Sequence, residues 1–68
     1  MSNVTVIMTE DDRATLRRIV REQGEMRAAT LLGVNNATLV RAAGGFGVQR
    51  TTAAALRLAL LELPKVIA

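Results

Sequence analysis

The chain has 68 residues, enough for one small domain. It contains neither cysteine nor histidine, which excludes disulfides and thiolate metal sites and removes the commonest general base near neutral pH. Nine basic and six acidic residues give a net charge of +3, and no acidic residue occurs between Glu25 and Glu62, a distribution that fits a polyanionic partner.

The first segment with a structural pattern is Asn3 to Met8, where β-branched residues alternate with polar ones. It predicts a short strand or an extended arm. Because one strand is not stable alone, we expect it to pair either with Lys65 to Ile67 or with the same strand of a second copy.

Two helices follow the arm. Thr9 is expected to cap a helix over about residues 10–23, with acidic residues in its first turn, and Gly24 to end it. A second helix is expected over about residues 25–32, with Met26, Ala29 and Leu32 turned toward the core. Gly33 then provides a turn in which a positive φ costs little.

A third helix is expected from Asn35 or Asn36 to about Ala43, and the glycine-rich residues 44–47 form a loop after it. Phe46, the one aromatic residue of the chain, is expected to fill the core. A fourth helix should run from about Arg50 to about Leu63, where Pro64 stops it.

These elements predict an all-α, four-helix helix-turn-helix domain with a short N-terminal strand or arm, and one domain over residues 1–68. The helix-turn-helix itself covers about residues 25–43. Ala29 lies four residues before Gly33 and Leu39 lies six after it, which is the spacing of two crossed helices around a sharp turn.

The third helix has the residues needed to read bases in the major groove of DNA. Asn36 can bond to adenine, Ala37 can contact a thymine methyl group, and Arg41 can bond to guanine. Asn35 and Thr38 flank this face and suit phosphate contacts. The competing interpretation is that the asparagines only cap the helix and that Arg41 is a solvated charge.

The segment GVNNATLVRAAGGFGVQRTT resembles the DNA-binding headpiece of lactose-repressor-type regulators. The resemblance places Asn36, Ala37 and Arg41 at base-reading positions and puts a second group near phosphates, namely Gln49, Arg50 and Thr52. The helix that precedes the motif is similar to that of phage Cro and repressor domains, and short stretches also resemble Fis-type motifs. No sugar-binding domain accompanies the motif, so no small-molecule ligand is implied.

The fourth helix has two apolar stripes, and a small monomer needs only one. One stripe contains Leu56, Leu60 and Leu63 and is expected to pack under the other helices. The second stripe is expected to meet another copy of the chain, and consists of Ala54, Leu58 and Leu61. A two-fold dimer of this kind would place two reading helices about 34 Å apart on a palindromic site.

The favoured function is therefore a homodimeric, sequence-specific double-stranded DNA-binding regulator of bacterial or phage type, acting as a repressor in the cytoplasm. It would need no cofactor or metal, would not enter a membrane, and would not be an enzyme. One alternative is a protein-interaction module, such as an antitoxin or a phage inhibitor, that uses the fourth helix. Another is a ribbon-helix-helix DNA binder that reads bases with Asn3 and Thr5 from residues 3–8.

Overall fold

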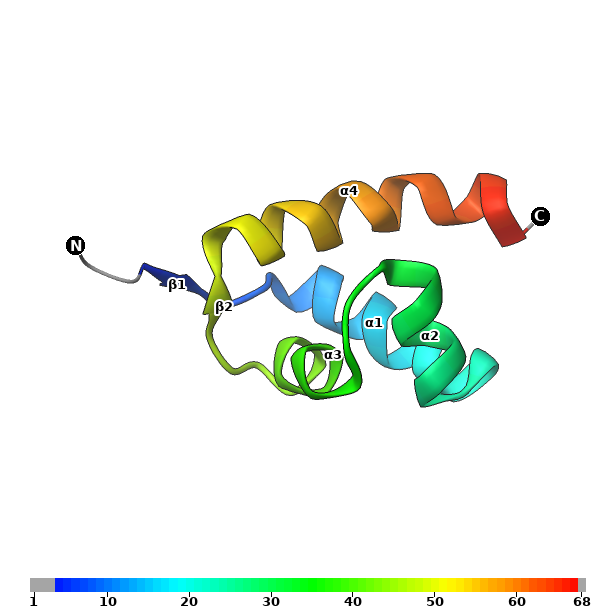
Figure 1. The fold of residues 1–68 in the computed structure, drawn as a ribbon, viewed down its shortest axis with the longest axis horizontal. Coiled ribbons are helices and arrows are strands. Elements are labelled where there is room, and N and C mark those ends of the chain that lie inside the picture. The colour runs from blue at the N-terminus through cyan, green and yellow to red at the C-terminus, as the bar shows by residue number, and fades with distance from the viewer. Residues whose placement is uncertain (1–3, 68) are drawn as a thin grey trace.

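The computed structural model describes residues 4–67, and the side chains of residues 4–62. This part of the chain forms four helices and two short strands in the order β1 (Thr5–Val6), α1 (Glu10–Gln23), α2 (Glu25–Leu32), α3 (Asn36–Ala43), β2 (Val48–Gln49) and α4 (Arg50–Ile67). Helix α4 lies along one side of the group formed by α1, α2 and α3, and the strands lie at one end of the molecule (Figure 1). The predicted all-α fold with a short N-terminal strand is confirmed.

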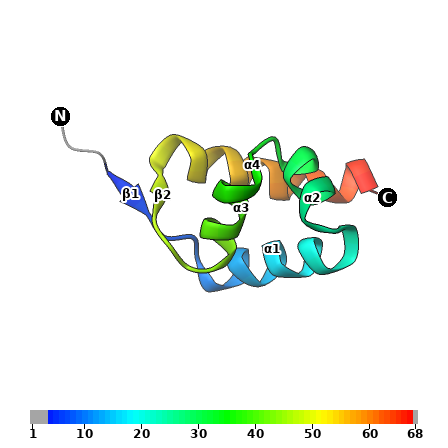
Figure 2. The same ribbon diagram turned by 60° about the horizontal axis from the view of Figure 1, so that its bottom comes forward.

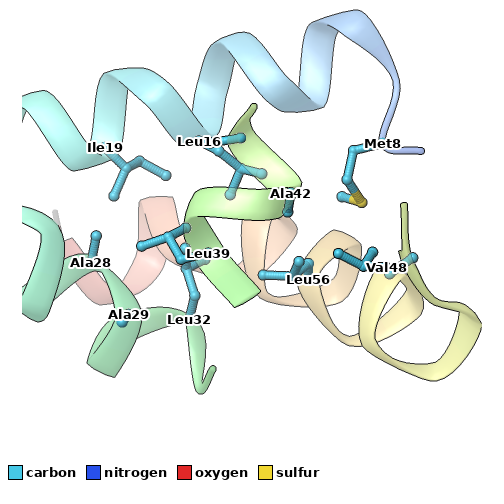
Figure 3. Packing of buried hydrophobic residues seen from close by; sticks show 12 residues of the cluster. Met8, Leu16, Ile19, Ala28, Ala29, Leu32, Leu39, Ala42, Val48 and Leu56 are labelled. Atoms are coloured by element: carbon cyan, nitrogen blue, oxygen red, sulfur yellow. The ribbon is translucent and has the colours of Figure 1, made fainter. Parts of the chain in front are cut away.

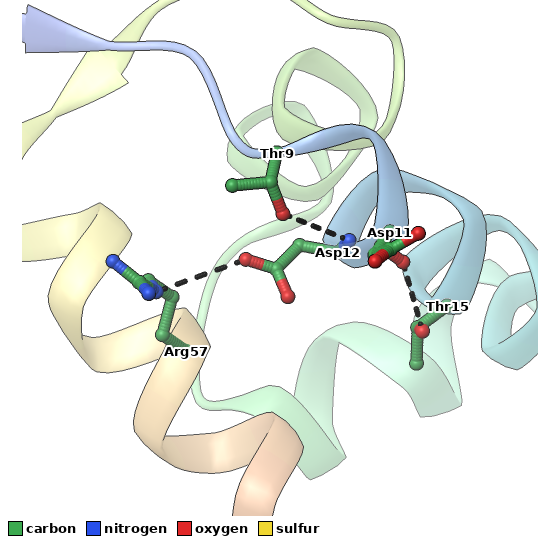
Figure 4. Close-up of polar contacts among 5 residues, drawn as sticks. All are labelled: Thr9, Asp11, Asp12, Thr15 and Arg57. Atoms are coloured by element: carbon green, nitrogen blue, oxygen red, sulfur yellow. Dashed lines mark hydrogen bonds and ion pairs between the residues drawn. The ribbon is translucent and has the colours of Figure 1, made fainter.

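The predicted helix ends of α1 and α2 are also confirmed. The Thr9 hydroxyl accepts a hydrogen bond from the Asp12 backbone N–H at 3.2 Å, so Thr9 caps α1 (Figure 4). Gly24 separates α1 from α2 with a φ of 87°, and Gly33 ends α2 with a φ of 73°. Both values lie in the region that favours glycine, so two glycines set the directions of the first three helices.

Three leucines from three different helices meet in the centre of the core. Leu16 of α1, Leu39 of α3 and Leu56 of α4 have no solvent-exposed surface (Figure 3). Helix α2 contributes the small residues Ala28 and Ala29, both buried, and small side chains let helix backbones approach closely. No polar or charged residue among those described is buried.

The N-terminal strand pairs within the chain, and the predicted pairing with Lys65 to Ile67 is wrong. Strand β1 is antiparallel to β2, with Thr5 opposite Gln49 and Val6 opposite Val48. Residues 65–67 instead belong to α4. The pairing needs Gly47 beside β1, because a Cβ atom at Gly47 would lie 3.0 Å from Thr5 Cβ. The two strands therefore fix the loop after α3 to the segment that leads into α1.

Two side chains predicted to be in the core are exposed. Met26 is 75% exposed, because the buried side of α2 is centred on Ala28, Ala29 and Leu32 and not on the side that includes Met26. Phe46 is 59% exposed; its surroundings are described with the candidate interface below.

Helix α4 buries one of its two apolar stripes. Ala53 and Leu56 are buried and Leu60 is partly buried, whereas the second stripe is exposed, with Leu58 62% and Leu61 73% accessible. The side chain of Leu63 lies outside the described residues. The helix also continues past Pro64 to Ile67, contrary to the prediction, because one proline removes a single backbone hydrogen bond and a helix can bend around it.

The core contacts lead to a prediction about stability. Replacing Leu39 with alanine should lower the free energy of unfolding by about 2–5 kcal/mol, because the side chain is fully buried. Met26→Ala removes a similar volume from an exposed position and should change stability by less than about 0.5 kcal/mol. Urea unfolding followed by circular dichroism measures both values. Equal losses in the two variants would contradict the description of the core.

Candidate nucleic-acid interface

Helix α3 has one buried side and one exposed side. Leu39, Ala42 and Ala43 are buried against the rest of the domain. With about 3.6 residues per turn, the opposite side of the helix carries Ala37, Val40 and Arg41, which are all exposed, and Asn36 lies beside them in the first turn and is also exposed. Three of these four are the residues that the sequence placed at base-reading positions, and the structure brings them together. Val40 was not anticipated, because its apolar side chain gave no signal for a contact surface.

Asn35 is used by the helix itself. Its side-chain Oδ1 accepts a hydrogen bond from the Thr38 backbone N–H at 2.7 Å, so Asn35 is the N-cap of α3. Asn36 begins the helix and is exposed, and no hydrogen bond from its side chain is found among the described residues. Of the two asparagines, Asn36 therefore has its amide free for a partner.

Arg41 is held across the loop that follows α3. Its Nη2 donates a hydrogen bond to the Gly47 carbonyl oxygen at 3.2 Å, and its Cζ lies 5.7 Å from the centroid of the Phe46 ring. That distance is typical of a cation–π contact. The guanidinium is thus oriented at the exposed edge of α3 before any partner arrives.

The prediction that Phe46 fills the core is wrong, because this side chain lies at the surface. A Cβ atom at Gly44 would lie 3.3 Å from two atoms of the Phe46 ring, so the ring covers the backbone at the end of α3. The core next to it is already filled by Leu39, Ala42 and Val48. Phe46 therefore packs on the surface, between the helix end and the Arg41 side chain.

A shallow groove adjoins α3 on the side of the strands. It is lined by Thr5, Thr38, Arg41, Gly47, Val48, Gln49 and Thr52. Four residues predicted to contact DNA, from three separate elements, thus border one groove: Thr38, Arg41, Gln49 and Thr52. Thr5 joins them through the pairing of β1 with β2, a long-range contact that the local sequence pattern could not reveal.

Arg50 borders a different groove. This second groove lies between α4 and the segment that leads into α1, and it also includes Asp12 and Arg57. The Arg57 Nε lies 3.7 Å from Asp12 Oδ2, which is the ion pair found among the described residues (Figure 4). Arg50 is therefore next to Gln49 in sequence but is turned away from Arg41.

The described residues offer little to a metal ion or a bilayer. No group of three or more acidic, histidine or cysteine side chains within them could hold a metal. None of the helices in residues 4–67 combines the length and the apolar character that crossing a membrane requires. The exposed side of α3 and the adjoining groove bring Arg41 together with the polar residues Thr5, Thr38, Gln49 and Thr52.

No known protein family, curated protein or solved structure matches the chain significantly. The resemblance to lactose-repressor-type headpieces rests on the motif residues alone and stays a prediction.

The two neighbouring asparagines are expected to differ in role: Asn35 stabilises the fold, and Asn36 is available for binding. Asn35→Ala should lower the free energy of unfolding by about 1 kcal/mol, since an N-cap hydrogen bond is lost. Asn36→Ala should leave stability within about 0.5 kcal/mol. Thermal unfolding of both variants measures this difference, and a larger loss for Asn36→Ala would show that the cap is wrongly assigned.

Proposed function

We propose that this protein binds double-stranded DNA in a sequence-specific manner, with α3 in the major groove. The observation that carries the proposal is the division of α3: Leu39, Ala42 and Ala43 anchor it in the domain, and Ala37 and Arg41 extend from the other side, with the exposed Asn36 beside them in the first turn. A rigidly anchored helix with an exposed polar side matches what groove reading requires.

Each residue of the exposed side has a suitable partner on a base edge. The Asn36 amide can pair with N6 and N7 of adenine, and the Arg41 guanidinium with O6 and N7 of guanine. Ala37 is small and apolar, as a contact with a thymine methyl group requires. Arg41 must exchange its hydrogen bond to the Gly47 carbonyl for the guanine, which is possible because that bond is exposed.

Backbone contacts are supported by the groove beside α3. Thr38, Gln49 and Thr52 carry hydroxyl or amide groups on its rim, and such groups commonly bind phosphate oxygens and set the register on the duplex. Helix α3 and its preceding turn also belong to the acid-free span between Glu25 and Glu62. Together these features favour DNA over a neutral or basic partner.

The exposed stripe of α4 supports binding as a homodimer. Ala54, Leu58 and Leu61 are exposed on a single side of the helix, and Ile7, 60% exposed, borders the same groove as Ala54. A second copy would cover these apolar side chains through a two-fold interface. Two reading helices would then meet a palindromic operator, and occupancy of that operator would repress transcription without any ligand domain.

A second candidate function is a protein-interaction module that uses the same α4 stripe to grip a different protein. The exposure of Leu58 and Leu61 is the observation that favours it. The structure disfavours a ribbon-helix-helix arrangement, because one edge of β1 is taken by β2 within the chain; Asn3 lies outside the described residues. Binding to bulk duplex DNA at low salt discriminates the interaction module from a DNA-binding protein.

Two arginine variants test the proposed contacts. On a duplex selected from a random pool, Arg41→Ala should weaken binding by about 1–3 kcal/mol and relax the preference at one base pair. Arg50 borders the other groove, so Arg50→Ala should leave the base preference unchanged and should change the salt dependence by less than the roughly one unit that a phosphate contact contributes. Fluorescence polarisation at several salt concentrations measures both effects. Unchanged affinity and preference in Arg41→Ala would contradict the groove assignment.

The mass of the protein in solution tests the proposed homodimer. Analytical ultracentrifugation should give twice the 7.3 kDa mass of one chain for the wild type. The double variant Leu58→Ser, Leu61→Ser should be monomeric, because its interface loses most of its apolar surface. Met26→Ser is the matched control, since Met26 is equally exposed on another helix. A wild-type protein that stays monomeric at high concentration would contradict the dimer.

A further inference from the structure

Two arginines of α1 reach the turn that follows α3. The Arg17 Nη1 donates a hydrogen bond to the Ala43 carbonyl oxygen at 3.1 Å, across 26 positions of sequence. The Arg13 Nη1 lies against Gly45, only 2.8 Å from where a Cβ atom of residue 45 would be. In Figure 2 the chain after α3 passes the N-terminal half of α1 before it reaches β2. No sequence pattern indicates these two contacts, because Arg13 and Arg17 belong to the half of the chain that is rich in acidic residues.

The turn is shaped to accept the Arg13 side chain. Gly45 has a φ of 86°, which favours glycine, and a Cβ atom at this position would require the Arg13 guanidinium to shift. The Arg13 Nε is buried and has no hydrogen-bond partner among the described residues. The Nη atoms of the same guanidinium carry further N–H donors, which can bind an anion.

Arg17 lies beside the exposed side of α3. It borders an apolar hollow with Val20, Val40, Ala43 and Gly44, and Val40 precedes the base-reading Arg41. The groove of Thr38, Gln49 and Thr52 adjoins α3 through Thr38 and Arg41, on the side of the strands. Arg17 therefore flanks α3 from the α1 side, and the threonine-lined groove flanks it from the other.

The charges of these two arginines are not neutralised by an ion pair within the described residues, where the Arg57–Asp12 pair is found on another part of the surface. Arg13 and Arg17 are four residues apart on one helix, a spacing at which like charges repel each other. Two cations held together by the fold, next to a turn of glycines, form a local positive field.

We propose that Arg17, assisted by Arg13, binds a backbone phosphate of the DNA on the α1 side of α3. This inference rests on the proposed function. The major groove is about 12 Å wide and a helix with its side chains is about 10–12 Å across, so a helix in the groove has a phosphate backbone on each flank. Thr38, Gln49 and Thr52 face one backbone, and the two α1 arginines face the other.

The test compares Arg17→Gln with Arg18→Gln on the same duplex, measured by polarisation between low and moderate salt. Both substitutions remove one exposed positive charge from α1, but Arg18 is turned about 100° further round the helix and does not border the hollow next to α3. Arg17→Gln should reduce the slope of log affinity against log salt by about 0.9, the value for one phosphate contact. Arg18→Gln should leave the slope unchanged.

Two further variants separate phosphate binding from a purely structural role of Arg17 at the end of α3. Arg17→Lys keeps the charge and should restore most of the slope, and Arg13→Gln should reduce the slope without touching the bond to Ala43. The base preferences of all four variants should equal those of the wild type, unlike those of Arg41→Ala.

Each other outcome overturns the inference. Equal slopes for Arg17→Gln and Arg18→Gln would show that the effect is one of net charge. A loss in Arg17→Lys equal to that in Arg17→Gln, with a matching fall in melting temperature, would show that Arg17 acts only on the fold. If the wild-type protein binds no duplex, the proposed function is overturned as well. If the wild-type protein binds duplex and the variants have the same slope of log affinity against log salt, only this inference is overturned.

Discussion

The burial of one side of α3 is the constraint on which the rest of the structure depends. Leu39 meets Leu16 and Leu56 in a core that no solvent reaches, and Gly33 turns the chain so that α3 can approach α1. Once Leu39, Ala42 and Ala43 are fixed inward, the helical repeat determines that Ala37 and Arg41 point outward. The proposed base contacts are thus a geometric consequence of core packing, and any rotation of α3 would exchange its buried and exposed sides.

The segments on either side of α3 complete this surface by tertiary contacts. The pairing of β1 with β2 sets Thr5 beside Gln49 and ties the start of α4 to the strand. The loop of residues 44–47 carries Phe46 over the helix end and brings the Gly47 carbonyl to Arg41. Arg17 ties α1 to the end of α3. A small domain with a modest core therefore uses its loop both to connect elements and to orient three arginines.

Much of the fold could be predicted from the sequence, because its helix ends are marked locally. Thr9, Gly24 and Gly33 each act within a few residues of their own position and were predicted, whereas the local pattern left the cap of α3 open between Asn35 and Asn36. What the sequence did not reveal depends on contacts between distant residues: the partner of β1, the surface position of Phe46, and the reach of Arg13 and Arg17 to the turn. For the candidate site, the periodicity of α3 predicted Ala37 and Arg41 on one face with Asn36 beside them, whereas Val40 and Thr5 required the three-dimensional arrangement.

The central claim is that the exposed side of α3 meets duplex DNA. The most direct measurement is a titration of the ¹⁵N-labelled protein with duplex DNA, followed by nuclear magnetic resonance shifts of the backbone amides. The account predicts that the largest shifts occur at Asn36, Ala37 and Arg41 and in residues 47–52, and that Met26, on the exposed side of α2, stays unchanged. Shifts confined to the exposed stripe of α4, or no shifts at any concentration of duplex, would contradict it.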